Sequence, residues 1–400
     1  MPSKTETVTA ARPGERAKDA GRAGDNRVRT LEVSVYKVPT DFPEADGTFR
    51  WQSTTVVFVE VESESGHRGI GYSYASPAAA TVINDLLKGV VVGADVEDVR
   101  AIWNVMIAGV RNIGRPGIAA TAISAIDIAL WDLKASVHEL SLVTLLGQRR
   151  ASVPIYGSGG FTSYSIQQLQ DQLAGWVKQG IPRVKMKVGT DWGTRPEVDV
   201  MRVRAARHAI GDEAELFVDA NGAYVVKQAI DQAVYFSQSG VTYFEEPVSS
   251  DHLEQLRFVR EHAPMNIAAG EYAYDPWYVR DMLNAQAVDI QQADVTRCLG
   301  ITGWLQASDI AYGFALPFSA HCAPAVHAII GCAASTLAHI EYFHDHVRIE
   351  RIFFDGVLEP KDGELRPDLS RPGLGLEFKR QDAERFLHTS PSPAGGGPGG

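Results

Sequence analysis

The alternation of apolar and polar positions near the start of the chain predicts β-strands. Residues 29–38 alternate as a half-buried strand does, and residues 53–75 have the pattern of two strands joined by a turn near Ser65 and Gly66. Between these segments, residues 39–51 are polar and contain Pro, Asp and Gly, so we expect a loop there. Together these segments predict a β-meander.

Three segments with apolar residues at helical spacing follow the meander, at residues 78–87, 96–108 and 118–137. The last of them is apolar on more than one side, which is typical of a helix packed between two surfaces. The strands and helices together predict an α+β capping domain over residues 29–148.

The pattern changes after residue 148, where strand-like segments alternate with amphipathic ones. Eight strand-like segments with seven helical segments between them indicate parallel βαβ units, which close into a (β/α)8 TIM-type barrel. The strand-like segments are residues 153–160, 183–189, 215–221, 242–247, 266–271, 289–295, 315–321 and 339–343. An open doubly wound sheet is the alternative, but the Gly-rich YGSGG segment lacks the GxGxxG spacing typical of that fold.

The same patterns divide the chain into five parts. The barrel is expected over residues 149–350, and residues 351–388 are expected to return to the capping domain and complete it. Residues 1–28 and 389–400 contain few large apolar side chains, so we expect disordered tails.

Composition excludes several classes of protein. The 38 Lys and Arg residues against 49 Asp and Glu give a net charge of −11 without a basic block, so we expect no nucleic-acid partner. No run of 18 apolar residues is present, and we expect no membrane span. Three cysteines without CxxC spacing and a polar N-terminus without a signal-peptide pattern predict a cytoplasmic protein with reduced thiols.

Ionisable side chains recur at the C-terminal ends of the predicted strands from the second strand onward. A charge buried without a partner costs several kcal/mol, so packing alone does not explain them. In a TIM-type barrel these strand ends meet at one face, where the active site lies. The residues are Lys185, Lys187, Asp219, Glu245, Glu271, Asp294, His321 and Glu341.

Asp219, Glu245 and Glu271 follow three consecutive strands and predict a metal site. Three neighbouring carboxylates repel one another unless a cation neutralises them, and oxygen ligands without His or Cys favour Mg²⁺. The alternative is three separate surface salt bridges at the starts of loops.

Lys185 and Lys187 stand two positions apart, so in a strand they point the same way, into the barrel. We expect a cation-rich cavity to lower the pKa of a lysine there and allow it to act as a base. A solvated strand edge is the alternative, but the flanking Val184, Met186 and Val188 indicate a buried strand.

Asp294 and His321 end adjacent strands, so we expect the carboxylate to orient the imidazole and raise its basicity. Glu341 stands in a ring of carboxylates, where it could be protonated and donate a hydrogen bond to a substrate oxygen. Cys322 follows His321 directly. Because neighbours in a strand point to opposite faces, we do not expect a Cys/His nucleophile.

In this order and spacing, the segments AISAIDIALWDLKA, VKMKV, VDAN, FEEP, AGE, DVTRCLGITG, SAH and HIE resemble the enolase superfamily and its mandelate racemase subgroup. The resemblance implies that Asp219, Glu245 and Glu271 hold one Mg²⁺ and that Lys187 is a base, with Lys185 beside it. His321, supported by Asp294, would then be the acid/base on the opposite face of the substrate. Glu341 and Asn221 would contact the substrate.

The implied reaction is removal of the proton α to a carboxylate through an enediolate. We expect dehydration to follow, giving a 2-keto-3-deoxy acid, because residues 39–51 carry charged side chains that suit a polyhydroxylated sugar acid. Such an enzyme is a Mg²⁺-dependent lyase. Racemisation or epimerisation, cycloisomerisation, and a non-catalytic sugar-acid-binding barrel are the alternatives. The resemblance also implies a homo-oligomer.

Overall fold

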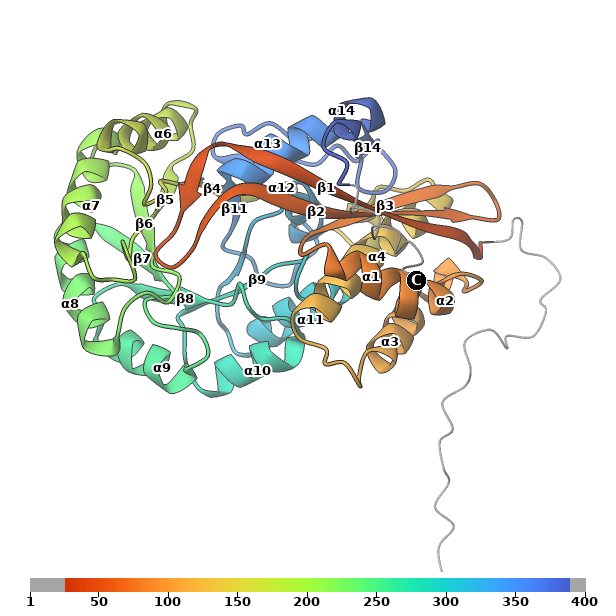
Figure 1. Cartoon of the computed structure of the whole chain (residues 1–400), viewed down its shortest axis with the longest axis horizontal. Helices are drawn as coiled ribbons and strands as arrows, with labels where there is room; N and C mark the ends of the chain where they lie inside the picture. Colours follow the sequence, from red (N-terminus) through yellow and green to blue (C-terminus); the bar gives the residue numbers. More distant parts are fainter. Residues whose placement is uncertain (1–25, 389–400) are drawn as a thin grey trace, which may run out of the picture.

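The computed structural model describes residues 26–388 and contains a capping domain beside a barrel (Figure 1). The C-terminal tail predicted from the sequence and most of the N-terminal tail lie outside the described residues. The capping domain is an antiparallel sheet in the order β1–β2–β3, followed by helical segments. Its elements are β1 (Val28–Ala45), β2 (Arg50–Ser63), β3 (Arg68–Tyr74), α1 (Ala78–Val82), η1 (Ile83–Leu87), α2 (Lys88–Val91), η2 (Val96–Asp98), α3 (Val99–Gly109), α4 (Ile118–Val137) and α5 (Leu142–Leu146).

The loop predicted for residues 39–51 is mostly strand, so that prediction is wrong. β1 and β2 continue pairing past an irregularity between Pro39 and Glu44, with Ala45 opposite Arg50. Only the turn between the strands remains. The Asp46 carboxylate accepts hydrogen bonds from the backbone N–H groups of Thr48 at 2.6 Å and Phe49 at 2.7 Å. Asp46 therefore stabilises a tight turn, and this polar residue belongs to the end of a hairpin rather than to a long loop.

Helix α4 is packed between two surfaces, as its apolar pattern predicts, and 16 of its 20 residues are buried. On one side it packs against β3 at Gly71, where an added Cβ would lie 2.2 Å from the Ala125 carbonyl oxygen. On the other side the Asp127 carboxylate accepts two hydrogen bonds from Thr302, both 2.8 Å long. Thr302 belongs to a helix of the barrel, so α4 joins the two parts of the molecule.

The barrel has eight parallel strands and closes by pairing of its last strand with its first. Each strand overlaps one of the eight segments predicted from the sequence. The strands are β4 (Val153–Gly159), β5 (Arg183–Lys187), β6 (Glu215–Asp219), β7 (Val241–Glu245), β8 (Asn266–Ala269), β9 (Ile290–Ala293), β10 (Phe318–Ala320) and β11 (His339–Phe343). The helices around them are α6 (Ile166–Lys178), α7 (Pro196–Ile210), α8 (Val226–Ser237), α9 (Leu253–His262), α10 (Pro276–Asn284), α11 (Gly300–Gly313), α12 (Pro324–Gly331) and α13 (His344–Phe353).

Strand register sorts the inward-facing side chains into layers. Lys187 pairs with Asp219 across β5 and β6, and Asp219 pairs with Glu245 across β6 and β7. Two positions earlier, Lys185 lies opposite Phe217, which stacks on Tyr243 with ring centroids 4.6 Å apart. Because side chains two apart share a face, β6 and β7 supply an aromatic floor beneath the charged layer, and β5 places Lys185 at the level of that floor.

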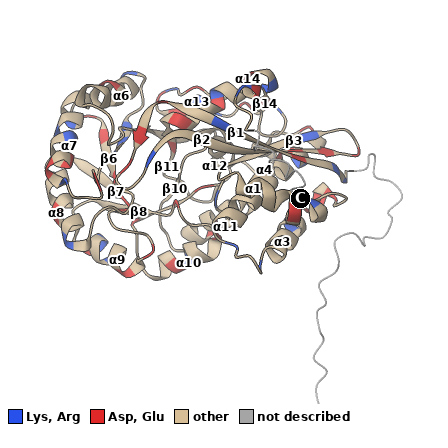
Figure 2. Ribbon diagram, viewed as in Figure 1, with Lys and Arg blue, Asp and Glu red and all other residues tan. Residues whose placement is uncertain are grey.

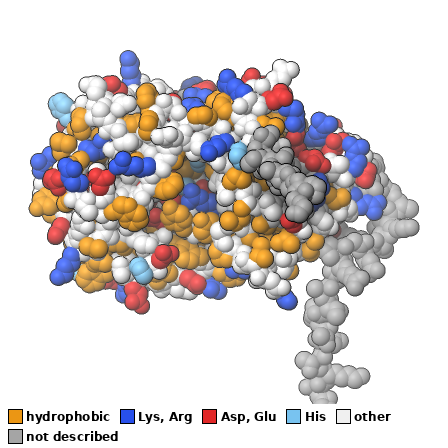
Figure 3. Space-filling model, in the orientation of Figure 1, with side chains coloured by type: hydrophobic (Ala, Val, Ile, Leu, Met, Phe, Trp, Pro, Cys, Tyr) orange, Lys and Arg blue, Asp and Glu red, His pale blue; other side chains and the backbone are white. Residues whose placement is uncertain are grey.

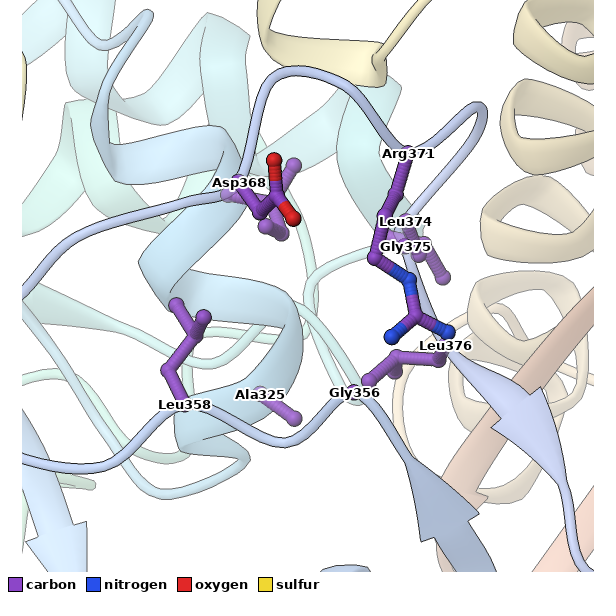
Figure 4. Close-up of a pocket in the computed structure, with 9 residues that line it drawn as sticks. Ala325, Gly356, Leu358, Asp368, Arg371, Leu374, Gly375 and Leu376 are labelled. Atoms are coloured by element: carbon purple, nitrogen blue, oxygen red, sulfur yellow. The ribbon is translucent and has the colours of Figure 1, made fainter.

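The segment after the barrel packs against the cap. It contains β12 (Phe354–Asp355), β13 (Glu364–Leu365), β14 (Glu377–Phe378) and α14 (Arg380–Glu384). The Phe378 ring stacks on Phe58 of β2 at 4.2 Å, and the Phe386 carbonyl accepts a 2.8 Å hydrogen bond from the Lys37 backbone. A small pocket lies between this segment and α12, with Asp368 and Arg371 in its lining (Figure 4). Its volume of about 10 Å³ accommodates about one water molecule, so it is too small for a substrate.

Acidic and basic residues are interspersed along the outer helices rather than segregated (Figure 2). The face shown in Figure 3 likewise mixes both signs of charge with apolar side chains. Among residues 26–388, none of the helices combines the length and apolar character that crossing a bilayer requires.

Candidate active site

All eight ionisable residues predicted at the strand ends are buried at one end of the barrel, and none is more than 5% exposed. Asn221, which follows β6, is partly buried beside them, and its Nδ2 lies 3.5 Å from Glu271 Oε2. The β1–β2 hairpin extends from the cap toward the ends of these strands (Figure 1). The site is therefore a buried cluster of charged side chains between the barrel and the hairpin.

The side chains of Asp219, Glu245 and Glu271 converge as predicted. Carboxylate oxygens of the three residues lie within 4.8 Å of one another, and all three side chains are buried. Within the described part of the chain, Glu245 Oε1 and Asn221 Oδ1 have no hydrogen-bond partner, although both atoms are buried. Unpaired buried oxygens beside an all-oxygen donor set fit a hard divalent cation such as Mg²⁺.

Counting charges supports the same conclusion. Five buried carboxylates (Asp219, Glu245, Glu271, Asp294 and Glu341) surround three permanent cations (Lys185, Lys187 and Arg297). Five negative charges against three positive ones, or four when His321 carries the proton that its raised pKa favours, leave the site with a net negative charge. A bound cation would neutralise this charge, and because the site is buried the neutralisation is worth several kcal/mol.

Both lysines form ion pairs in the cavity. Lys185 Nζ lies 2.5 Å from Glu245 Oε2 and 2.8 Å from Glu341 Oε1, and Lys187 Nζ is paired with Asp219. Burial lowers the pKa of each lysine, but the surrounding carboxylates outweigh this effect and raise it. The prediction of lowered lysine pKa values is therefore wrong for this structure, because acids rather than cations surround the two side chains.

His321 and Asp294 form the predicted pair, with Nδ1 and Oδ2 2.8 Å apart. The other Asp294 oxygen accepts hydrogen bonds from the backbone N–H and the hydroxyl of Thr296, at 2.7 and 2.8 Å. His321 Nε2 faces the metal-ligand candidates and lies 3.4 Å from Glu271 Oε2. Burial lowers the pKa of His321, but Glu271, Glu341 and Asp294 together raise it. The imidazolium form is thus favoured, which suits a proton donor.

Glu341 is held by donors on three sides. Ser158 donates a 2.6 Å hydrogen bond to Oε1, and the Cys322 backbone N–H donates a 2.9 Å bond to Oε2. Burial raises the pKa of Glu341, but Lys185 and His321 lower it well below its usual range. The suggestion of a protonated Glu341 is therefore wrong for this structure, where the carboxylate is ionised by its ion pair with Lys185.

Cys322 lies beside His321, not on the opposite face as expected. Its Sγ is 3.3 Å from His321 Nε2 and 3.4 Å from Glu341 Oε2. β10 ends at Ala320, and the backbone of Cys322 has φ of +54°, so strand alternation no longer applies there. Burial and nearby carboxylates raise the pKa of the thiol well above its usual value. The thiol is therefore a poor nucleophile. The expectation that Cys322 and His321 do not form a nucleophilic pair thus rests on this raised pKa and not on strand alternation.

Two further ionisable residues belong to the site and were not predicted. Arg297 lies in the DVTRCLGITG segment, and its Nη1 is 3.2 Å from Glu271 Oε1. It stands three positions after Asp294, so it follows the end of the same strand, and this position was the signal in the sequence that could have identified it. Glu246 follows Glu245, and burial together with Glu271 raises its pKa well above the usual value.

The hairpin packs directly on the mouth of the barrel. An added Cβ on Gly47 would lie 2.6 Å from the Ala220 carbonyl oxygen and 2.9 Å from that of Val188. Trp51 packs against Phe161 with ring centroids 5.6 Å apart. The end of β3 also contributes, because its last residue, Tyr74, stacks on His346 with ring centroids 3.3 Å apart.

The charged side chains of the hairpin are bonded within the protein. Arg50 pairs with Asp191 at 2.9 Å, and Asp41 pairs with His344 at 2.9 Å. Glu44 is 1% exposed and accepts a hydrogen bond from the Trp51 indole. These residues therefore do not by themselves indicate a polyhydroxylated ligand, contrary to the reasoning from sequence.

Two family models match this chain. The N-terminal domain of the mandelate racemase / muconate lactonizing enzyme family matches residues 30–147, and the enolase C-terminal domain-like model matches residues 168–383. The chain therefore belongs to the mandelate racemase / muconate lactonizing enzyme family of the enolase superfamily.

Two curated relatives are 31% identical to the chain. One is the arabinonate dehydratase of Saccharolobus solfataricus, with the match covering 81% of this chain and 88% of that protein. The other is the 3,6-anhydro-α-L-galactonate cycloisomerase of Streptomyces coelicolor, with coverage of 88% and 97%.

Solved structures agree with this assignment. A mandelate racemase/muconate lactonizing enzyme-like protein from Rubrobacter xylanophilus is 53% identical, with a TM-score of 0.87 over 90% of this chain and all of that chain. The L-talarate/galactarate dehydratase of Salmonella typhimurium, solved with Mg and L-lyxarohydroxamate, is 28% identical, with a TM-score of 0.83 over 95% and 98%.

Proposed function

We propose that this protein is a Mg²⁺-dependent dehydratase of a sugar acid that yields a 2-keto-3-deoxy acid. One observation carries the proposal: a buried acidic trio is flanked by two groups able to carry protons, Lys187 beside Asp219 and His321 beside Glu271. Dehydratases of arabinonate and of talarate and galactarate among the relatives support this choice of reaction.

Asp219, Glu245 and Glu271 would hold the Mg²⁺, which supplies positive charge to the substrate carboxylate as negative charge develops on it. Lys187 removes the proton α to that carboxylate, and Lys185 stabilises the negative charge beside it. Removal of this proton requires the Lys187 amine, whose pKa the metal would lower by neutralising the surrounding carboxylates. Asn221 and Glu341 contact the substrate.

His321 then acts on the neighbouring carbon. Its imidazolium donates a proton from Nε2 to the β-hydroxyl, which leaves as water, and the resulting enol tautomerises to the keto acid. Asp294 holds Nδ1, so that Nε2 is the nitrogen that faces the cavity. The raised pKa of His321 supports this role, because the proton must be present when the hydroxyl leaves.

Cycloisomerisation is the second candidate, favoured by the cycloisomerase among the relatives. Its residues would be the same, and the outcome depends on where the second proton goes. Racemisation or epimerisation would return that proton to the α carbon. A non-catalytic sugar-acid-binding protein would need neither proton carrier.

A substrate screen tests the proposal. We expect one or more aldonic or aldaric acids to give a 2-keto acid in the presence of Mg²⁺, with solvent deuterium incorporated at the carbon that loses the hydroxyl. Lys187→Ala and His321→Asn should each lower turnover at least about 100-fold. The matched controls are the exposed residues Lys178 and His208, whose Lys178→Ala and His208→Asn variants should retain turnover.

Three results would contradict the proposal. An inverted product without keto acid would indicate a racemase or epimerase, and a lactone product or substrate would indicate a cycloisomerase. Turnover that persists after metal removal would exclude the metal-dependent reaction. Homo-oligomerisation and a cytoplasmic location remain predictions, and light scattering of the purified protein measures the first.

A further inference from the structure

A second group of ligand-type side chains lies outside the catalytic centre, where the cap meets the barrel. Asp41 and Glu44 belong to β1, and His344 is the first residue of α13. One possible ligand atom from each residue lies within 4.8 Å of the others. Asp41 Oδ2 and His344 Nε2 are 2.9 Å apart, so the cap and the barrel already touch at this point.

Glu44 adds an independent observation. Its side chain is almost fully buried at 1% exposed, and only Oε2 has a partner, the Trp51 indole N–H at 2.7 Å. Oε1 is buried without any hydrogen-bond partner among the described residues. A buried acceptor left unpaired costs about 1–3 kcal/mol, so this oxygen calls for a proton or a cation.

The charges around Glu44 favour a cation. Asp41 and Asp345 are the neighbouring acids, and burial followed by repulsion from Asp345 raises the pKa of Glu44 to about 9. Asp345 is itself engaged, because Thr54 donates to one oxygen and Arg348 pairs with the other at 2.5 Å. Arg348 is thus the one permanent cation bonded to this group of acids among the described residues, and it does not bond Glu44.

The donor atoms are close enough for one ion to reach them. Two ligands at about 2.1 Å from a tetrahedral ion are about 3.4 Å apart. Asp41 Oδ2 and His344 Nε2 now share a 2.9 Å hydrogen bond, so an ion would replace the shared proton and widen this pair by about 0.5 Å. Two carboxylates with one imidazole favour a first-row transition metal over Mg²⁺, which prefers oxygen ligands alone.

We propose that Asp41, Glu44 and His344 form a second metal site, which takes a divalent transition-metal ion and cross-links the cap hairpin to the barrel. Binding replaces the proton shared within the group and releases it to solvent. The site takes no part in the chemistry described above. It restrains the β1–β2 hairpin over the cavity, because two of its ligands lie on the hairpin and the third on the barrel.

Zn²⁺ is the probe that tests the site. The full chain, held in excess Mg²⁺, is titrated with Zn²⁺ against a chromophoric chelator. We expect one Zn²⁺ equivalent that His344→Asn and Glu44→Gln each weaken at least about tenfold. Asp41→Asn, at a more exposed position, should weaken it as well, and this variant covers the case in which the Glu44 substitution disturbs folding.

Two other groups could bind Zn²⁺ and serve as controls. They are the catalytic trio, removed by Glu245→Gln, and the group of His321, Cys322 and Glu341, removed by Cys322→Ala. We expect the Zn²⁺ equivalent to persist in both control variants. Its loss in either control, or unchanged binding in His344→Asn, would overturn the proposal.

Hydrogen exchange provides a second readout that does not require activity, so it is independent of the proposed reaction. Zn²⁺ should slow amide exchange of residues 39–51 in the unmodified chain at least about tenfold, and His344→Asn should abolish this effect. Equal exchange with and without Zn²⁺ would also overturn the proposal.

Discussion

At the scale of single residues, the hydrogen bond between His321 and Asp294 determines which imidazole nitrogen faces the cavity. The bond joins Nδ1 to a carboxylate that Thr296 holds through two further bonds, so the ring has one favoured orientation. The Asp294 carboxylate is 1% exposed, but the hydrogen bond from His321 and the positive charges of His321 and Arg297 outweigh burial and lower its pKa. Its negative charge therefore stabilises the imidazolium form of His321.

Replacing this carboxylate tests its contribution. Asp294→Asn keeps the shape but removes the charge, so His321 loses the preference for its proton and its fixed tautomer. We expect kcat to fall about 10²- to 10⁴-fold with little change in melting temperature. Steady-state kinetics beside a circular dichroism melt provide the measurement. Turnover within about threefold of the unmodified enzyme would contradict the assigned role.

Residue identities in the site were predictable from sequence, but their protonation was not. From the second strand onward each strand carried one charge near its C-terminal end, except that the second carried two, and their spacing was typical of a barrel, which identified the eight residues. The pKa directions of Lys187 and Glu341 depend on how many opposite charges the fold places around each side chain. The position of Cys322 depends on a left-handed backbone conformation that no residue type in the SAHC segment indicates.

At the scale of elements, the β1–β2 hairpin covers the cavity because its turn packs closely against two strand ends of the barrel. Gly47 makes this approach possible, since its missing Cβ would collide with the carbonyl oxygens of Ala220 and Val188. Ala220 follows Asp219 directly. A displacement of the hairpin would therefore change the packing of the backbone next to the predicted metal ligand Asp219.

Gly47→Ala should push the turn away from the barrel. We expect kcat/KM to fall about tenfold or more, while the melting temperature changes little because only the tip of the hairpin has to move. The matched control is Gly109→Ala in α3, where an added Cβ meets nothing within 4 Å. Equal kinetics in the two variants would show that the close approach of the hairpin does not matter for turnover.

A second contact between elements gives a pH-dependent stability. Glu350 of α13 accepts hydrogen bonds from the Tyr72 hydroxyl at 2.6 Å and the Ala325 backbone at 3.0 Å, and burial raises its pKa to about 8. In the unfolded chain the pKa is about 4.3. Between these two pH values the folded protein keeps a proton that the unfolded chain has lost, so the free energy of unfolding falls as the pH rises.

Glu350→Gln should remove this dependence, because the amide stays neutral. Relative to the unmodified protein, we expect the variant to gain about 1–3 kcal/mol in free energy of unfolding between pH 4.5 and pH 8. Denaturant unfolding across this range measures the difference, with the exposed Glu254→Gln as control. A difference that stays constant with pH would contradict the assignment.

The elements themselves followed from the sequence except at the hairpin. The barrel strands and α4 are buried on two sides, which gives them long apolar patterns. Such patterns can be recognised from the sequence alone. Residues 39–51 pair only because the capping sheet extends and the barrel supports the turn. That support comes from residues more than 100 positions away, such as Val188, which local composition does not reveal.

At the scale of the whole molecule, the buried charges link the metal to stability. Without a metal, the five ionised carboxylates of the site outnumber its positive charges even when His321 is protonated. The electrostatic repulsion this leaves in the folded protein is relieved in the unfolded chain, where the charges are separated and solvated.

Removing the metal should therefore destabilise the protein as well as inactivate it. Addition of Mg²⁺ to 100 times its Kd is expected to raise the free energy of unfolding by about 2.7 kcal/mol over the EDTA-treated protein. Thermal melts over a Mg²⁺ series measure this rise. Glu245→Gln removes one ligand and should show a smaller rise, and the absence of any rise in the unmodified protein would contradict the site.

The stacking of Phe378 on Phe58 has a consequence for the order of folding. The two rings are separated by the entire barrel in sequence, so the cap sheet lacks this aromatic partner until translation has passed the last barrel helix. The barrel, whose contacts run mostly between successive units, can assemble earlier on the ribosome. Until then, the newly made cap exposes the apolar surface that Phe378 later covers. A chain that ends after α13 is therefore expected to need chaperones to avoid aggregation.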